Sequence, residues 1–268
     1  MRLFRADAAV IAFGSFLTGA HLASGAKAAD LLAAVLVTAF SANFCYSFNA
    51  YTDWPVDAIN KPRRPIPRGL VSPRGALVYS LFLLAGSLVF PFFLANNTFS
   101  LLCFLLIPAL GLAYSANPVR LKERPPFSVL TVSLGLILPL VIGYANAGGM
   151  DARMYFFFGA LFLFCASLVG LKDVEDVAGD TALSQVNLYD RYGSRLLAFS
   201  IAGLAATSVY VALTPIPSML KTWLLLLLPA EAACILCHLR FGWNLARLYH
   251  RIIRLMLLLG AGLCLYLL

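Results

Sequence analysis

The chain has 268 residues, of which 61% are hydrophobic and only 12% are charged. Soluble domains average about 45–50% apolar and about 25% charged residues, so this composition excludes an ordinary soluble domain and a disordered chain. Apolar stretches of about 18–22 residues separate short charged clusters, and a helix needs about 20 residues to cross a bilayer. The stretches lack the alternation of barrel strands, so the sequence predicts an all-α, polytopic membrane protein.

Nine apolar segments have the length of membrane-spanning helices. They cover residues 8–25, 29–50, 74–95, 98–116, 126–147, 153–172, 195–213, 217–239 and 251–268. With the N-terminus on the cytoplasmic side, 17 of the 20 Lys and Arg residues fall in cytoplasmic segments, and only Lys27, Arg153 and Lys221 fall outside. This distribution follows the positive-inside rule at every loop. The net charge of +8 therefore indicates topology and anionic headgroups or substrates, and nucleic acid is not an expected partner.

The first segment is interpreted as a span and not as a cleavable signal peptide. Arg2 and Arg5 precede it, but no convincing small-x-small cleavage site comes after it. All six cysteines lie inside predicted spans, where we expect them to pack as small apolar residues without disulfides.

The second segment ends in an acidic motif formed by Asn49, Asp53 and Asp57. A spacing of four places these side chains on one face of a helix. Oxygen ligands without a nearby His or Cys suit a hard cation such as Mg²⁺. The alternative is a solvated acidic helix end, which stacked like charges would destabilise. Pro55 lies between the two Asp residues, so we expect the helix to bend or end there and Asp57 to come from a turn.

Two basic runs come next, one in the loop after the acidic motif and one after the fourth span. The residues expected to contact a diphosphate there are Arg63, Arg64, Arg68, Tyr114, Arg120 and Lys122. A planar guanidinium can bind two phosphate oxygens at once. The alternative for each run is ordinary positive-inside charge. Against it, Pro62, Pro65 and Pro67 stiffen the first run, as a fixed pocket lid requires.

A second acidic motif lies after the sixth segment. Asp173, Asp176 and Asp180 recur at intervals of three and four, again on one helical face. Glu175 points elsewhere, and four acids within eight residues repel one another, so a divalent ion is the economical counter-charge. Lys172 alone would not neutralise them. The alternative is a solvated acidic loop.

Glu231 is the only acidic residue in the eighth segment. An ionisable residue inside a span is a functional hypothesis by default. It either faces a cavity or pairs with Lys221 or a polar neighbour.

Together these motifs resemble the UbiA-type intramembrane prenyltransferases. The first acidic motif and the Asn-Lys-Pro-Arg-Arg-Pro-Ile-Pro-Arg-Gly stretch at 60–69 are similar to that family's first signature. Asp176-x3-Asp180 is similar to its second, and Tyr114-Ser-x-x-Pro118 to its fourth-span ending. The Lys-Asp-x-Glu-Asp-x-x-Gly-Asp form at 172–180 is most similar to the branch that prenylates glyceryl phosphates.

The resemblance implies one domain over residues 1–268, with nine helices around a central cavity open sideways to lipid. It implies two Mg²⁺ ions that bridge the substrate diphosphate. The expected metal ligands are Asn49, Asp53, Asp57, Asp173, Asp176 and Asp180, and the expected catalytic carboxylates are Asp53, Asp57, Asp176 and Asp180. Asn49 and Lys172 join the residues expected to contact the diphosphate.

The expected reaction is Mg²⁺-dependent transfer of a prenyl group from a prenyl diphosphate to a lipophilic or aromatic acceptor, through ionisation of the allylic C–O bond. Tyr46, Tyr51 and Tyr114 are candidates for shielding the carbocation. The site loops and the N-terminus are expected on the cytoplasmic side. The sequence does not name the acceptor.

Three alternatives remain. Ala50 in the first motif, and Thr181 and Tyr189 near the second, depart from the common family pattern. The departures around the second motif make a membrane terpene cyclase on the same scaffold the second interpretation. A transporter or channel is disfavoured because spans two and six lack charge at mid-membrane. A CDP-alcohol phosphotransferase is disfavoured because its Asp-x-x-Asp-Gly-x-x-Ala-Arg signature is absent.

Overall fold

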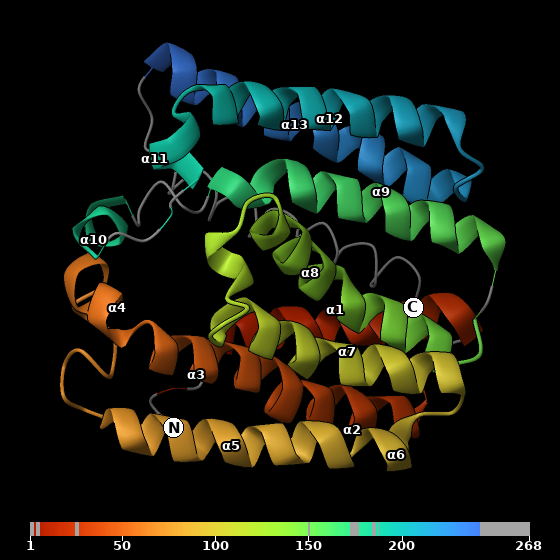
Figure 1. Ribbon diagram of the computed structural model, residues 1–268. Helices are drawn as coiled ribbons and strands as arrows, with labels where there is room; N and C mark the ends of the chain where they lie inside the picture. Colours follow the sequence, from red (N-terminus) through yellow and green to blue (C-terminus); the bar gives the residue numbers. More distant parts are fainter. Residues whose placement is uncertain are drawn as a thin grey trace. The chain divides into compact units, whose positions relative to one another are not determined.

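A computed structural model describes residues 3, 6–24, 27–149, 151–171, 177–183, 186 and 188–241. These residues form helices and connecting loops without strands (Figure 1). Six helical segments among them are long and apolar enough to cross a membrane: Ala28–Thr52, Pro73–Leu94, Thr98–Ser115, Phe127–Asn146, Ala152–Val169 and Arg195–Leu213. Shorter apolar helices occupy Ala8–Ala23 and Ser218–Pro229. The predicted all-α membrane architecture is confirmed, whereas the ninth predicted span, 251–268, lies outside the described residues.

The helices group into two compact units. The first unit holds α1 (Ala6–Ser24), α2 (Ala28–Leu36), η1 (Val37–Ala42), α3 (Asn43–Thr52), α4 (Trp54–Asn60), α5 (Pro73–Val89), α6 (Pro91–Leu94), α7 (Thr98–Ser115), η2 (Leu121–Glu123) and, apart from Val132–Leu134, α8 (Phe127–Asn146). The second holds α9 (Ala152–Val169), α10 (Val177–Ala182), α11 (Leu188–Tyr192), α12 (Arg195–Leu213) and α13 (Ser218–Phe241). In the first unit α3 packs against α5 and α7, and in the second α12 packs against α9 and α13.

The second span is not one regular helix, because a π-helical segment, η1, separates α2 from α3. A π turn frees backbone groups from the usual hydrogen-bond pattern. Asn43 compensates for this by donating from its side-chain Nδ2 to the carbonyl of Thr38 at 2.8 Å. Both residues are buried. The apolar pattern of the sequence did not predict this interruption.

Helix α3 is held on two sides within the first unit. The hydroxyl of Ser80 on α5 donates to that of Ser47 on α3 at 3.0 Å, and both residues are fully buried. On the other side Gly111 of α7 faces Cys45, whose sulfur lies where a Cβ on Gly111 would come too close. Small residues allow such close approach of helices in membranes. The helix that ends in the first acidic motif is therefore fixed against both neighbours.

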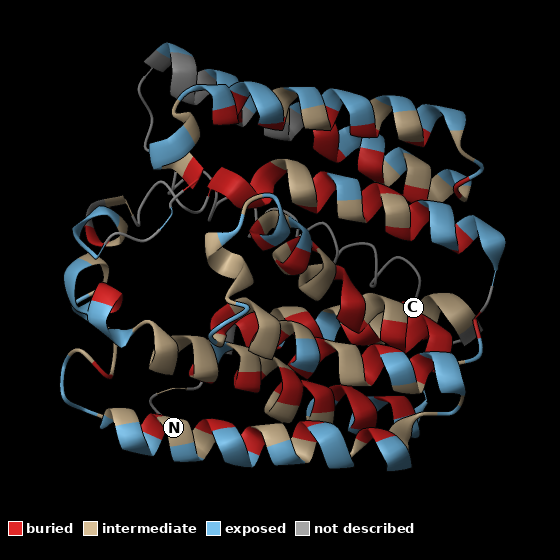
Figure 2. Cartoon of the chain, in the orientation of Figure 1, coloured by how far each residue is buried: buried red, intermediate tan, exposed pale blue. Residues whose placement is uncertain are grey.

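Helix α5 shows how burial divides one span into two faces. Ala76, Ser80 and Leu83 are buried, at intervals of three and four, and therefore lie on one face of the helix. Figure 2 shows the buried residues of α5 on the side that faces the other helices of the unit. Leu81 and Phe82, at 52% and 62% exposed, lie on the opposite face. Exposed apolar side chains on a span of this length are what a lipid environment accommodates.

Replacing Gly143 with Ala is expected to destabilise the fold. A Cβ at this position of α8 would overlap the backbone carbonyl of Phe16 on α1, and a Cβ at Gly19 of α1 would overlap the carbonyl of Leu140. Overpacking of this kind typically costs about 1–3 kcal/mol. Thermal unfolding in detergent should therefore show a lower midpoint for Gly143→Ala.

Gly135, on the same helix, is the matched control, because a Cβ there meets nothing within 4 Å. Gly135→Ala should leave the midpoint unchanged or raise it, since Ala favours helix over Gly by about 1 kcal/mol. Equal midpoints for the two variants would contradict the close α1–α8 contact.

Candidate active site

The first acidic motif lies across a helix break. Helix α3 ends at Thr52, Asp53 has φ −103° and ψ 4°, and α4 begins at Trp54 with Pro55 in its first turn. The fixed φ of proline suits this position. The predicted break near Pro55 is therefore present, but Asp57 lies in the short helix α4 and not in the turn that we expected. Hydrogen bonds from the Asp53 amide to the Asn49 carbonyl (2.9 Å) and from the Asp57 amide to the Asp53 carbonyl (2.8 Å) keep the spacing of the motif.

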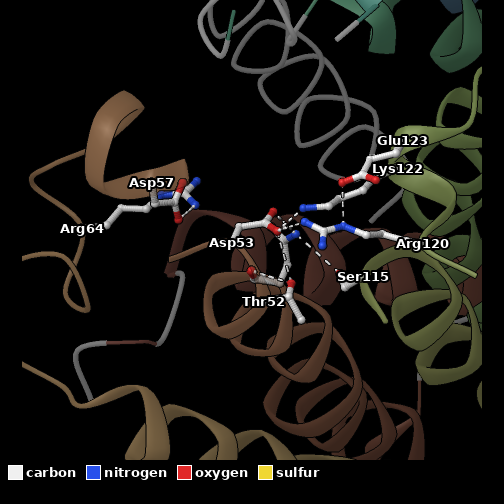
Figure 3. Close-up of polar contacts among 9 residues, drawn as sticks. Thr52, Asp53, Asp57, Arg64, Ser115, Arg120, Lys122 and Glu123 are labelled. Atoms are coloured by element: carbon white, nitrogen blue, oxygen red, sulfur yellow. Dashed lines mark hydrogen bonds and ion pairs between the residues drawn. The ribbon is translucent and has the colours of Figure 1, made fainter. Parts of the chain in front are cut away.

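Asp53 is the centre of a polar network (Figure 3). Its Oδ2 accepts a hydrogen bond from the side-chain amide of Asn49 at 2.7 Å. Its Oδ1 accepts from the Lys122 ammonium and, at 3.3 Å, from the Thr52 hydroxyl, and it lies 3.7 Å from Nη2 of Arg120. Lys122 and Arg120, which we expected to bind a diphosphate, thus contact Asp53, which we expected to bind a metal ion.

Asp57 has a cation of its own. Nη1 of Arg64 lies 2.5 Å from Oδ2 of Asp57, whose side chain is 7% exposed (Figure 3). Burial raises the pKa of Asp57, and the positive charge of Arg64 opposes that rise. Burial likewise lowers the pKa of Lys122, and the Asp53 carboxylate opposes that fall. For both groups, burial disfavours the charged form and the opposite charge of the partner favours it.

The loop after α4 carries the other basic residues of the first run. Ile66 is buried and anchors it, and the amides of Arg68 and Gly69 donate to the carbonyls of Arg64 and Ile66 at 3.1 and 2.9 Å. Arg63 and Arg68 are exposed. A shallow, open depression of about 620 Å³ is lined by residues 60–65. Among the described residues, Arg64 is the one arginine of this loop that contacts a motif carboxylate.

The end of α7 contributes from a third direction. Tyr114 is half-buried, and the next residue, Ser115, is buried at the helix end. Nδ2 of Asn49 lies 3.4 Å from the Ser115 hydroxyl, which joins α7 to the acidic motif. Aromatic rings line α3 below the motif: Phe44 stacks on Phe48 at 5.5 Å between centroids, and Phe48 lies 6.1 Å from Tyr51.

The second acidic motif belongs to the other unit. Asp180 lies on α10 and is half-buried. Lys172, Asp173 and Asp176 lie outside the described residues, as does the side chain of Glu231 on α13. The expectation that the two motifs share one site stays a prediction.

The residues in place fit a hard divalent cation. In the part of the chain that the structure describes, no three His, Cys, Asp or Glu residues cluster as metal ligands. The first motif supplies two carboxylates and one amide, all oxygen donors. Mg²⁺ characteristically takes one or two carboxylates and completes its shell with water and substrate phosphate. A metal ion at Asp53 would replace Lys122 and Arg120 as the partner of that carboxylate. The two cations would then be available to bind an anion.

Glu123 belongs to this network but was not predicted from the sequence. Glu123 lies in η2, and its Oε1 is 2.7 Å from Nε of Arg120. The available signal was a lone acid inside the basic run that contains Arg120 and Lys122. Ser115 lies in the Tyr114-Ser-x-x-Pro118 stretch, but we did not predict from the sequence that it contacts the acidic motif.

Comparison with known proteins identifies the family of the chain. The model of the UbiA prenyltransferase family matches residues 10–259, and this chain belongs to that family. It is therefore a membrane prenyltransferase, which sets aside the transporter, channel and CDP-alcohol phosphotransferase interpretations. The similarity includes both units described above.

Relatives and solved structures agree over most of the chain. The digeranylgeranylglyceryl phosphate synthase of Natronomonas pharaonis is 33% identical over 247 residues, 87% of this chain and 83% of the relative. The synthase of the same name from Methanopyrus kandleri is 34% identical over 259 residues, 93% and 90% of the two chains. The structure of a UbiA homologue from Archaeoglobus fulgidus bound to GPP and Mg²⁺ superposes with a TM-score of 0.78 at 20% identity, covering 97% of each chain. This likeness confirms the fold.

Proposed function

We propose that this chain transfers a prenyl group from a prenyl diphosphate to a prenylated glyceryl phosphate, with Mg²⁺ as cofactor. The observation that carries the proposal is the cluster at the end of α3, where Asp53 and Asp57 face Lys122, Arg120 and Arg64. The names of the relatives and the form of the second acidic motif favour a glyceryl phosphate as acceptor.

The metal would be held by the two acidic motifs of the single domain we expect. Its proposed ligands are Asn49, Asp53, Asp57, Asp173, Asp176 and Asp180. When bound, Mg²⁺ neutralises charge on the diphosphate and makes it a better leaving group. We place this site on the cytoplasmic side, in line with the distribution of Lys and Arg.

The basic residues are proposed to bind the leaving diphosphate. Lys122 and Arg120 already lie at the acidic centre, and Arg64 lies at Asp57. Arg63, Arg68, Lys172 and Tyr114 complete the proposed set. As the allylic C–O bond breaks, its electron pair leaves with the diphosphate, and positive charge fixed beside those oxygens stabilises the transition state.

The aromatic rings of α3 are proposed to shield the allylic cation. Phe48 and Tyr51 are half-buried on the helix that ends next to Asp53, with 6.1 Å between their ring centroids, and the fully buried Phe44 stacks on Phe48. A ring face attracts a cation and carries no nucleophile that would capture it. The acceptor hydroxyl then forms the new C–O bond and releases its proton.

The test uses the purified protein with geranylgeranyl diphosphate and geranylgeranylglyceryl phosphate, with Mg²⁺ or with EDTA, and mass spectrometry of the products. We expect the doubly prenylated glyceryl phosphate only when both substrates and Mg²⁺ are present. A cyclic hydrocarbon or terpene alcohol formed without the acceptor would instead show a cyclase. Product formed equally well in EDTA would contradict the proposed metal site.

A further inference from the structure

Arg120 has an unusual backbone conformation. Its φ is +38° and its ψ 60°, and it is the only non-glycine residue with positive φ among those that the structure describes. An L side chain disfavours this left-handed region, and such outliers persist where the surroundings require them. The conformation lies between the end of α7 and η2 and sets the direction in which the Arg120 side chain leaves the loop.

The guanidinium of Arg120 lies between two carboxylates (Figure 3). Its Nε is 2.7 Å from Oε1 of Glu123, and its Nη2 is 3.7 Å from Oδ1 of Asp53. The Nε group is buried and makes no aligned hydrogen bond, so charge holds the contact with Glu123. The side chain is 18% exposed, which leaves it little freedom to turn away.

The position of Glu123 is electrostatically unfavourable for binding an anionic substrate. A carboxylate next to a site for an anionic diphosphate repels the substrate, and the repulsion grows as the surroundings exclude water. Its side chain is only 30% exposed, and its carboxylate contacts Arg120. An acid in this position therefore needs a compensating role, and the contact with Arg120 indicates where to look for it.

We propose that Glu123 is a positioning residue that holds the Nε side of the Arg120 guanidinium, so that its terminal Nη groups face the Asp53 end of the site and bind the substrate diphosphate there. The inference rests on the proposed function. Without Glu123, Asp53 would be the remaining carboxylate for Arg120 among the described residues, and a guanidinium can engage one carboxylate with two parallel hydrogen bonds. That pairing would occupy the donors of Arg120 and also the carboxylate of Asp53.

The direct test measures binding of inorganic diphosphate to the purified full-length protein in Mg²⁺ by calorimetry, together with kcat and KM for prenyl diphosphate. Glu123→Gln is expected to weaken diphosphate binding and raise KM roughly tenfold, with a smaller change in kcat. Glu123→Asp keeps the charge and should restore part of the loss. Asp151→Asn is the matched control, because it removes one negative charge at the start of α9 and keeps a side chain able to cap that helix.

If Glu123 had no positioning role, the expected change in diphosphate affinity would have the opposite sign. If Glu123 merely lies near the site, its neutralisation should leave diphosphate binding unchanged or tighten it. That result, with Mg²⁺-dependent binding intact in the unmodified protein, would overturn the inference and leave the proposed function standing. Absence of diphosphate binding in the unmodified protein would overturn both.

A double-mutant cycle tests whether Glu123 acts through Arg120. Once Arg120→Gln has removed the guanidinium, adding Glu123→Gln should weaken diphosphate binding no further. Independent, additive losses would contradict a positioning role. Thermal unfolding of each variant separates a loss of binding from a loss of fold.

Discussion

Asp53→Asn is expected to lower kcat/KM for prenyl transfer roughly a thousandfold or more, because it removes a proposed metal ligand and the centre of the charge network. Asn keeps the size of the side chain and its contact with Asn49, so the fold should survive. The measurement is turnover at saturating Mg²⁺ with circular dichroism as the check on folding. Asp176→Asn, in the second motif, should cause a loss of similar size.

For binding of diphosphate in the absence of metal, the same variant is expected to show no loss. Without metal, the Asp53 carboxylate holds Lys122 and Arg120. Asp53→Asn releases both cations, so inorganic diphosphate should bind in EDTA at least as tightly as to the unmodified protein. Asp151→Asn serves as the control for loss of one negative charge. Turnover near that of the unmodified protein at saturating Mg²⁺ would refute the assignment of Asp53.

Lys122→Gln is expected to lower kcat/KM roughly ten- to a thousandfold, about 1.4–4 kcal/mol of transition-state stabilisation. Its side chain is 10% exposed and contacts Asp53 directly. Loss of the ammonium also leaves part of the Asp53 charge without a counter-ion, so stability should fall slightly. Steady-state kinetics with prenyl diphosphate, supported by a thermal unfolding curve, measures both effects.

Arg74→Gln is the matched control for Lys122→Gln, because it also removes one positive charge and Arg74 is exposed in the first turn of α5. Arg68→Gln tests the exposed part of the loop, and its effect should lie between the two. If all three variants retained equal activity, the basic residues of these loops would serve only to set the membrane topology. The acidic motif would then be the only support for a diphosphate substrate.

The length of the apolar segments and the capping residues at their ends made the spans predictable. The predicted segments 98–116 and 195–213 match Thr98–Ser115 and Arg195–Leu213 closely. Asn97 marks the start of the former, because its side chain accepts a hydrogen bond from the Ser100 amide at 2.8 Å. The first and eighth segments contain shorter apolar helices, and the count of nine stays a prediction.

Side-chain partners were harder to predict than helix ends. The helix break near Pro55 was predictable from backbone chemistry, since proline removes an amide donor. The pairing of Lys122 with Asp53 joins residues 69 positions apart, and local spacing carries no information on such a contact. Glu123 was overlooked because its contact with Arg120 goes with the positive φ of the Arg120 backbone, which no residue pattern encodes.

The π-helical segment at Val37–Ala42 makes the direction of the acidic motif depend on the length of the chain. A π turn takes up one more residue than an α turn, and each residue added to or removed from a helix rotates the remainder of that helix by roughly 100°. A helical wheel drawn for α2 therefore does not extend to Asn49 or Asp53. Deleting one residue within this segment would redirect both side chains without altering either, whereas most substitutions there would keep their direction. In this part of the membrane the number of residues matters more than their identity.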